Sequence, residues 1–99
     1  MILVRNVFRL KFGKAKEAVA LLKEGVAIQK SAGMNFSPRI LTDVTGPFYT
    51  LVLELSMPNF AAFESQSPQL FANKDWQSNY QKMTALVESG HREIYNIVE

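Results

Sequence analysis

Aliphatic, β-branched and aromatic residues gather in four short stretches, which predict β-strands at residues 2–11, 38–45, 48–56 and 92–98. Apolar residues occupy both faces of the first strand, with Asn6 among the even positions and Arg5 and Arg9 among the odd ones. A strand of this kind is usually covered on both sides. Gly46 and Pro47 predict the turn between the second and third strands.

Two further stretches have the apolar spacing of helices. The first covers residues 14–32 and ends before Gly33. It contains Gly25, which either permits a close contact with the sheet or a ligand or is tolerated at a cost of about 1 kcal/mol relative to alanine. The second begins after Asn59, a good N-cap residue, and Pro68 is predicted to interrupt it.

A third helical stretch follows Asn73, another predicted N-cap, and is expected to end at Gly90. Its large apolar residues have the spacing i, i+4, i+7 and i+11, which predicts one buried stripe. The stripe consists of Trp76, Tyr80, Met83 and Val87.

The predicted order of elements is β-α-β-β-α-β, with the second helix split in two. This order indicates an α+β, ferredoxin-like domain over residues 1–99, with an antiparallel sheet whose first and third strands are central. Right-handed crossovers place the helices on one face of the sheet. The other face is then bare and partly apolar, so we expect a homodimer formed through it.

The amino-acid composition argues against several kinds of functional site. The chain of 99 residues has no cysteine and one histidine, so we expect no metal site and no cofactor. The net charge is +2 and the lysines are scattered, which argues against a nucleic-acid partner. No stretch approaches the roughly 20 apolar residues of a membrane span, and we find no signal peptide. We therefore expect a cytoplasmic protein without a membrane partner.

Three segments resemble the small dimeric α/β-barrel proteins of the NIPSNAP-like and antibiotic-biosynthesis monooxygenase-like groups. They are "RLKFGKAKEAVALL", "FYTLVLELSMPNFAAFES" and "ANKDWQSNYQKMTALVESGHREIYNIV", the last with Trp76 between Asp75 and Gln77. The resemblance covers nearly the whole chain. It implies a dimeric α/β barrel with a ligand cavity between the sheet and the helices of each subunit.

Two positions depart from the pattern of these groups. Ser56 stands where an aromatic residue often ends the central strand, and the second helix lacks the histidine often found there. Proteins with this fold include oxygenases, isomerases, haem enzymes and proteins of no assigned activity, so the fold alone does not select one of these activities.

His91 is the candidate catalytic residue. A histidine can act as a general base near neutral pH, and strand alternation would align His91 with Glu93 and Tyr95 on one face. The alternative is a solvent-exposed histidine in a loop after Gly90, at the start of the last strand.

Candidate ligand-binding residues lie on several elements. Trp76 and Tyr80 either cover a planar ligand or pack as helix-to-sheet core. Asn6 either binds a ligand carbonyl or a water, or satisfies a neighbouring backbone group. Glu54 lies among apolar neighbours and needs a cation, for which Arg5, Arg9 and Arg39 are candidates; it is either a general base or one partner of an inter-subunit ion pair.

Two functional hypotheses follow. The first is a cofactor-free, monooxygenase-like enzyme or binder that takes a small, partly apolar molecule, with His91 as base and Asn6, Trp76 and Tyr95 in the pocket. The second is a non-catalytic dimerisation or ligand-sensing module whose interior is filled by aromatic side chains. The presence of a void beside those side chains distinguishes the two.

Overall fold

The computed structural model describes all 99 residues and confirms the predicted order of elements. The elements are β1 (Ile2–Leu10), α1 (Ala15–Ser31), β2 (Arg39–Thr42), β3 (Thr50–Met57), α2 (Phe60–Phe71), α3 (Lys74–Thr84) and β4 (Val87–Asn96). None of the helices is long and apolar enough to cross a membrane.

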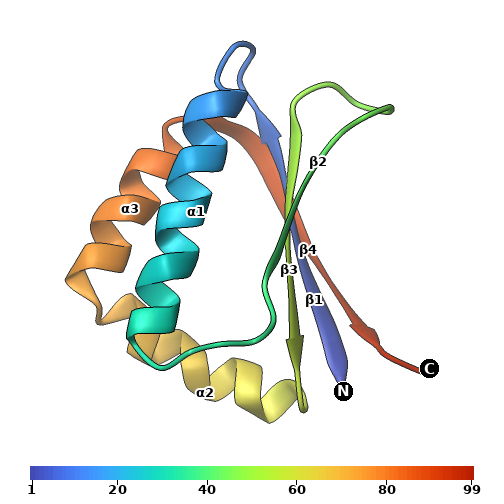
Figure 1. The fold of residues 1–99 in the computed structure, drawn as a ribbon, viewed down its shortest axis with the longest axis vertical. Helices are drawn as coiled ribbons and strands as arrows, with labels where there is room; N and C mark the ends of the chain where they lie inside the picture. Colours follow the sequence, from blue (N-terminus) through green and yellow to red (C-terminus); the bar gives the residue numbers. More distant parts are fainter.

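The strands form one antiparallel sheet in the order β2-β3-β1-β4, so β1 and β3 are central as predicted. The helices lie on one side of this sheet and leave the other side uncovered, as the edge-on view shows (Figure 1). We call the uncovered side the open face. The structure is therefore the ferredoxin-like α+β fold that the sequence predicts.

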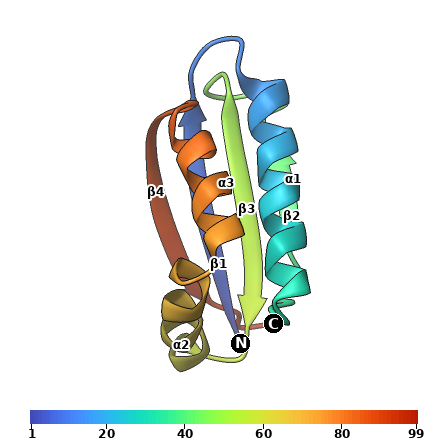
Figure 2. The ribbon, with the colours of Figure 1, turned by 90° about the vertical axis from the view of Figure 1, so that its left-hand side faces the viewer.

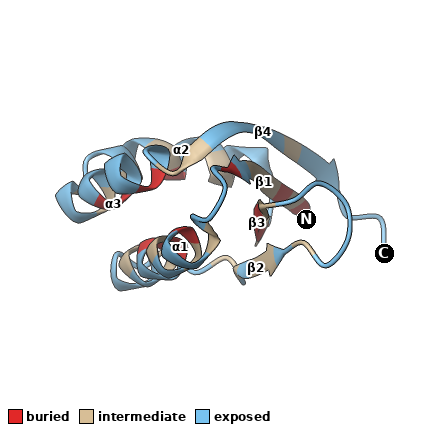
Figure 3. Ribbon diagram, turned by 90° about the horizontal axis from the view of Figure 1, so that it is seen from above, coloured by how far each residue is buried: buried red, intermediate tan, exposed pale blue.

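The core lies between the sheet and the helices, where the buried residues of both layers face one another (Figure 3). Even positions of β1 pair with odd positions of β3, and these positions point toward the helices. The fully buried side chains Val4, Leu51 and Met57 belong to this set. Asn6 lies on the same face of β1, opposite Leu53.

The β2–β3 connection is longer than the predicted turn, because β2 ends at Thr42 and β3 begins only at Thr50. The side chain of Asp43 accepts a hydrogen bond from the Thr50 amide at 2.9 Å, which closes the loop before ladder pairing begins. Tyr49 has a positive φ of 59°, a conformation that does not continue a strand. Phe48, expected within the third strand, therefore lies in this loop and is exposed.

Pro68 does not interrupt the second helix. The helix α2 runs through it to Phe71, and the Pro68 carbonyl accepts a hydrogen bond from the Ala72 amide. Proline lacks an amide donor, but it continues to accept. The break falls instead at Asn73, whose side chain caps α3 by accepting from the Trp76 amide at 3.0 Å.

Gly90 does not end a helix either. The third helix stops at Thr84, and β4 begins at Val87 and pairs along the whole length of β1. A Cβ atom at Gly90 would lie 3.1 Å from the Val7 carbonyl oxygen, so this position is crowded by the neighbouring strand. His91 therefore lies inside β4, opposite Val7, and not at the start of the last strand.

Gly25 permits a close contact with another helix. Its Cα faces Asn79 on α3, and a Cβ at this position would lie 2.8 Å from Asn79 Oδ1. Asn79 also donates a hydrogen bond to the Leu21 carbonyl at 2.9 Å, which ties α3 to α1. The buried stripe of α3 accordingly consists of Asn79 and Met83, whereas Tyr80, predicted to be buried, is 49% exposed.

Candidate functional site

A cavity of about 510 Å³ lies between the helix-covered face of the sheet and the helices α1 and α3. Its volume falls within the roughly 300 to 1,000 Å³ of typical small-molecule sites. The sheet contributes Asn6, Phe8 and Arg92 to its lining, and α1 contributes Val26 and Gln29 among others. The void predicted by the first functional hypothesis is therefore present beside the aromatic residues.

Trp76 and Tyr80 of α3 form an aromatic wall of this cavity. Their rings are stacked, with centroids 5.0 Å apart and planes inclined by 13°. Phe71 packs edge-on against Trp76 at 5.2 Å and supports the wall from α2. Trp76 is half-buried and Tyr80 is exposed, both line the cavity, and the stacked pair offers the outer face of a ring as a flat apolar surface.

Asn6 and Arg92 form the polar part of the sheet surface in the cavity. They are opposite each other in the β1–β4 ladder, and Arg92 Nε donates to Asn6 Oδ1 at 2.6 Å. The guanidinium carbon of Arg92 also lies 5.0 Å from the centroid of the Phe63 ring on α2. Both the hydrogen bond and the cation–π contact hold the arginine in place.

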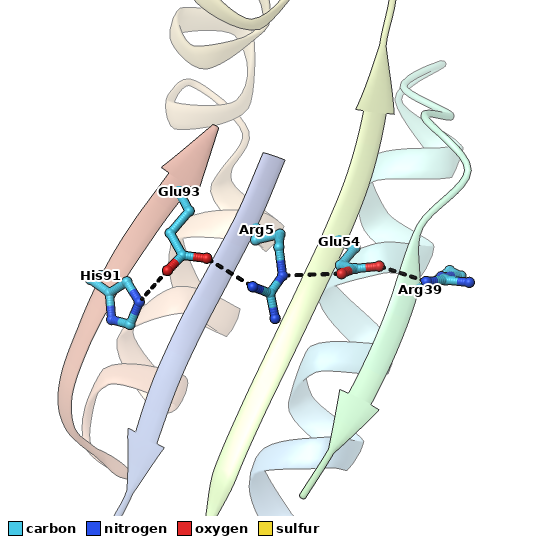
Figure 4. A network of polar contacts seen from close by, with 5 residues as sticks. All are labelled: Arg5, Arg39, Glu54, His91 and Glu93. Carbon is cyan, nitrogen blue, oxygen red and sulfur yellow. Dashed lines mark hydrogen bonds and ion pairs between the residues drawn. The ribbon is translucent and has the colours of Figure 1, made fainter. Parts of the chain in front are cut away.

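The open face carries a different set of polar residues, which form a continuous row across all four strands (Figure 4). Glu54 accepts from Arg39 at 2.8 Å and from Arg5 Nε at 3.1 Å. The Nη1 atom of Arg5 donates to Glu93 at 2.8 Å, and His91 Nε2 lies 3.2 Å from the other oxygen of Glu93. We call these five residues the charged row.

Glu54 is 8% exposed, and the charged row explains how a buried carboxylate is tolerated at the centre of the sheet. Of its three predicted partners, Arg5 and Arg39 pair with it within the chain, and Arg9 does not. Both carboxylate oxygens are satisfied by charged donors, which offsets the cost of removing the carboxylate from water.

The pKa of Glu93 is lowered from its ordinary value. The largest cause is the hydroxyl of Tyr95, a side chain on the same face of β4. His91 and Arg5 lower the pKa further, while partial desolvation acts in the opposite direction. Glu93 therefore remains a carboxylate and can orient the His91 ring, as the alternation of β4 predicts.

The six predicted site residues thus divide between the two faces of the sheet. Asn6, Trp76 and Tyr80 line the cavity. The Glu54 and His91 side chains point to the open face, where the His91 side chain is 60% exposed. His91 borders the cavity as part of β4, but its imidazole lies on the far side, beside Glu93 (Figure 4). Tyr95 shares that side.

Arg92 is a cavity residue that sequence reasoning missed. Nothing in the local pattern "GHREIYN" distinguishes Arg92 from a solvent-exposed arginine. The signal that identifies it is the strand register, which places Arg92 opposite Asn6 and on the same face as the cavity. The predicted last strand begins at residue 92 and the observed one at Val87, so the sequence did not reveal this pairing.

A second hollow, of about 820 Å³, lies between the start of α1 and the β2–β3 loop. It is wider and more open than the cavity, and its lining includes Lys16, Lys23 and the exposed Phe48. It lacks the paired amide and guanidinium groups that converge in the cavity. No cluster of three or more histidine, cysteine, aspartate or glutamate residues that could hold a metal ion is found.

Comparisons with known proteins identify the fold. No protein-family model matches the chain, and no curated protein matches it. Among solved structures, a NIPSNAP family protein from Agrobacterium tumefaciens is 21% identical with a TM-score of 0.88, over 99% of this chain and 86% of that one. An uncharacterized NIPSNAP domain protein from Burkholderia xenovorans is 17% identical with a TM-score of 0.87, over 99% and 95%.

An antibiotic biosynthesis monooxygenase is 16% identical to this chain with a TM-score of 0.77, over 100% of both chains. The chain therefore has the fold of NIPSNAP proteins and of monooxygenase-like ferredoxin-fold proteins. The resemblance drawn from the sequence is confirmed at this level. At such low identities the comparisons identify the fold and do not assign an activity.

Proposed function

We propose that this protein binds a small, partly apolar molecule in the cavity between its sheet and its helices, and that it does so as a homodimer. The observation that supports binding most directly is the composition of the cavity. A flat aromatic wall on α3 faces a few fixed polar groups on the sheet, and this combination is typical of small-molecule sites.

The charged row supports a homodimer through the open face. Its four permanent charges follow the strand order as Arg39, Glu54, Arg5 and Glu93, so that positive and negative charges alternate. A two-fold axis that lies in the interface and crosses the centre of the row at right angles reverses the row. Each charge of one copy then meets an opposite charge of the other copy. Self-complementarity of this kind is what a two-fold symmetric interface requires.

The proposal is one of binding. The imidazole of His91 and the aromatic wall lie on opposite faces of the sheet, so His91 does not reach a ligand in the cavity. Its role as a base stays a prediction. A substrate that His91 deprotonates would have to lie at the open face. A monooxygenase-like reaction is therefore a separate hypothesis from binding in the cavity.

Filling the cavity tests the proposal. Val26 is a half-buried residue of α1 that lines it, so Val26→Phe should place a ring in the ligand space. Native mass spectrometry of the protein as purified should show ligand mass on the wild type and none on this variant. Titration with a small apolar probe, followed by fluorescence of Trp76, should show binding weakened about tenfold or more in Val26→Phe, or by about 1.4 kcal/mol or more, because the new ring occupies the ligand space.

Val19→Phe is the matched control. Val19 lies seven residues earlier on the same helix, is also half-buried, and lines the second hollow instead of the cavity. This variant should bind like the wild type. Equal binding by the wild type and both variants, or no binding by the wild type, would contradict a ligand site in this cavity.

A further inference from the structure

We propose that Arg92 is the anion-binding residue of the cavity and that the ligand carries a carboxylate on an aromatic or otherwise apolar body. This inference rests on the proposed binding function and specifies its ligand class. It derives from three features of Arg92: its position, the hydrogen-bond donors it leaves free, and the surface that faces it.

Arg92 is fixed in position by two other elements of the fold. Asn6 on β1 accepts a hydrogen bond from Nε at 2.6 Å, and Phe63 on α2 lies beneath the guanidinium at 5.0 Å. An arginine held in this way loses less conformational entropy when it binds a ligand than a free surface arginine would. The position is preorganised for recognition.

Arg92 also retains most of its donors. A guanidinium has five N–H groups, and the contact with Asn6 uses only the one at Nε. Arg92 takes part in none of the ion pairs of the chain. Glu93, the adjacent residue in sequence, points to the open face and pairs there with Arg5.

The charge of the cavity indicates a monoanion. Arg92 is the only lysine or arginine among the lining residues, and no aspartate or glutamate lines the cavity. One guanidinium binds one carboxylate through two parallel hydrogen bonds. A phosphate dianion would leave a charge without a partner in this lining, so a carboxylate is the better match.

The apolar part of the ligand is indicated by the aromatic wall. Trp76 and Tyr80 present stacked rings to the same cavity, and Phe8 and Leu53 contribute apolar surface from the sheet. A planar apolar body can stack there while its carboxylate reaches Arg92 at the edge of the sheet. In Figure 2, β4 lies at this edge, beside α3.

The test compares an acid with a neutral analogue of the same shape. Hydrocinnamate and hydrocinnamyl alcohol differ only in the group that would meet Arg92. Trp76 is the only tryptophan of the chain, so its fluorescence reports binding in the cavity. The wild-type protein should bind the acid about tenfold or more tightly than the alcohol, as expected for a charged hydrogen-bonded pair.

Arg92→Met should remove that preference by weakening binding of the acid far more than binding of the alcohol. Lys16→Met removes the same charge from the second hollow and should keep the preference for the acid. Equal affinity for acid and alcohol in the wild type would overturn the role of Arg92 while leaving the cavity a binding site. Failure of both probes to bind the wild type would overturn the proposed function as well.

Salt dependence provides a measurement that needs no variant, in case Arg92→Met does not fold. Added salt should weaken binding of hydrocinnamate to the wild-type protein and leave binding of the alcohol nearly constant, because salt screens the interaction between two charges. The same salt dependence for both probes would contradict an ionic contact with Arg92.

Discussion

Glu54 and Glu93 show how single residues of this protein depend on the face of the sheet to which they point. Each accepts a hydrogen bond from Arg5, so one arginine on β1 bridges two carboxylates on the strands at either side of it. Arg92 is adjacent to Glu93 in sequence, yet it points to the other face and pairs with Asn6. The alternation of side chains along a strand thus separates the charged row from the cavity.

The lowered pKa of Glu93 predicts a dependence of stability on pH. A carboxyl group whose pKa is lower in the folded state stabilises the protein fully above its unfolded pKa of about 4.3. That stabilisation is lost as the pH falls through the folded pKa, because the protonated group no longer pairs with Arg5 and His91. The free energy of unfolding, measured with urea, should therefore fall below about pH 4.3.

Glu93→Gln should reduce this fall, since glutamine has no proton to bind. Glu64 is exposed and forms no ion pair, so Glu64→Gln is the matched control and should retain the wild-type pH dependence. Identical pH profiles for the wild type and Glu93→Gln would show that Glu93 has no role in acid sensitivity.

At the scale of elements, the contact between α1 and α3 determines where the helices lie over the sheet. Gly25 allows α3 to approach, and Asn79 joins the two helices by donating to the Leu21 carbonyl. Met83, the next buried residue of α3, then packs into the core. The same arrangement places Trp76 and Tyr80 at the border of the cavity, where they form its wall.

Gly25→Ala should destabilise the protein although alanine favours helix by about 1 kcal/mol. The new Cβ would lie 2.8 Å from Asn79 Oδ1, and Asn79 is a short, buried side chain that cannot move without losing its hydrogen bond. We expect a net loss of about 1–2 kcal/mol in the free energy of unfolding.

The sign should reverse in the Asn79→Ala background. Without the amide of Asn79 the clash is gone, so Gly25→Ala should raise the free energy of unfolding by up to about 1 kcal/mol through helix propensity. A double-mutant cycle measured with urea gives this coupling directly. Additive effects of the two substitutions would mean that the contact between the two positions does not limit stability.

At the scale of the whole molecule, the two faces of the sheet differ in what covers them. One face packs on α1, α2 and α3, and the other carries the charged row (Figures 1 and 4). The strand register places Leu3, Val7 and Tyr95 on the same open face. A chain of this size buries a modest fraction of its surface, and pairing of two open faces would add to its stability. The proposed dimer thus meets both an electrostatic and a hydrophobic requirement.

Val7→Lys should convert the proposed dimer to a monomer. Val7 lies on the central strand β1 between Arg5 and Arg9 on the open face, so a lysine there adds a third positive charge to this strand at the proposed interface. Sedimentation velocity should show the mass of one chain. Ala27→Lys adds the same charge at an exposed position of α1 and should remain a dimer. A wild-type monomer would contradict pairing through the open face.

Local pattern alone determined the order of elements and the N-caps at Asn59 and Asn73, and the topology rules applied to that order then predicted which two strands are central. The elements and their caps depend on residues that are close in sequence, where alternation and capping operate. The prediction that His91, Glu93 and Tyr95 share a face also follows from alternation within one strand.

Tertiary structure decided everything that depends on register. Pairing with β1 extends β4 through Gly90, and this pairing places Arg92 opposite Asn6 and moves His91 into the middle of the strand. The partners of Glu54, the contact of Gly25 with Asn79 and the cavity itself each join residues from separate elements. Such contacts are fixed by hydrogen-bond registers and helix packing over long sequence separations, which local periodicity does not encode.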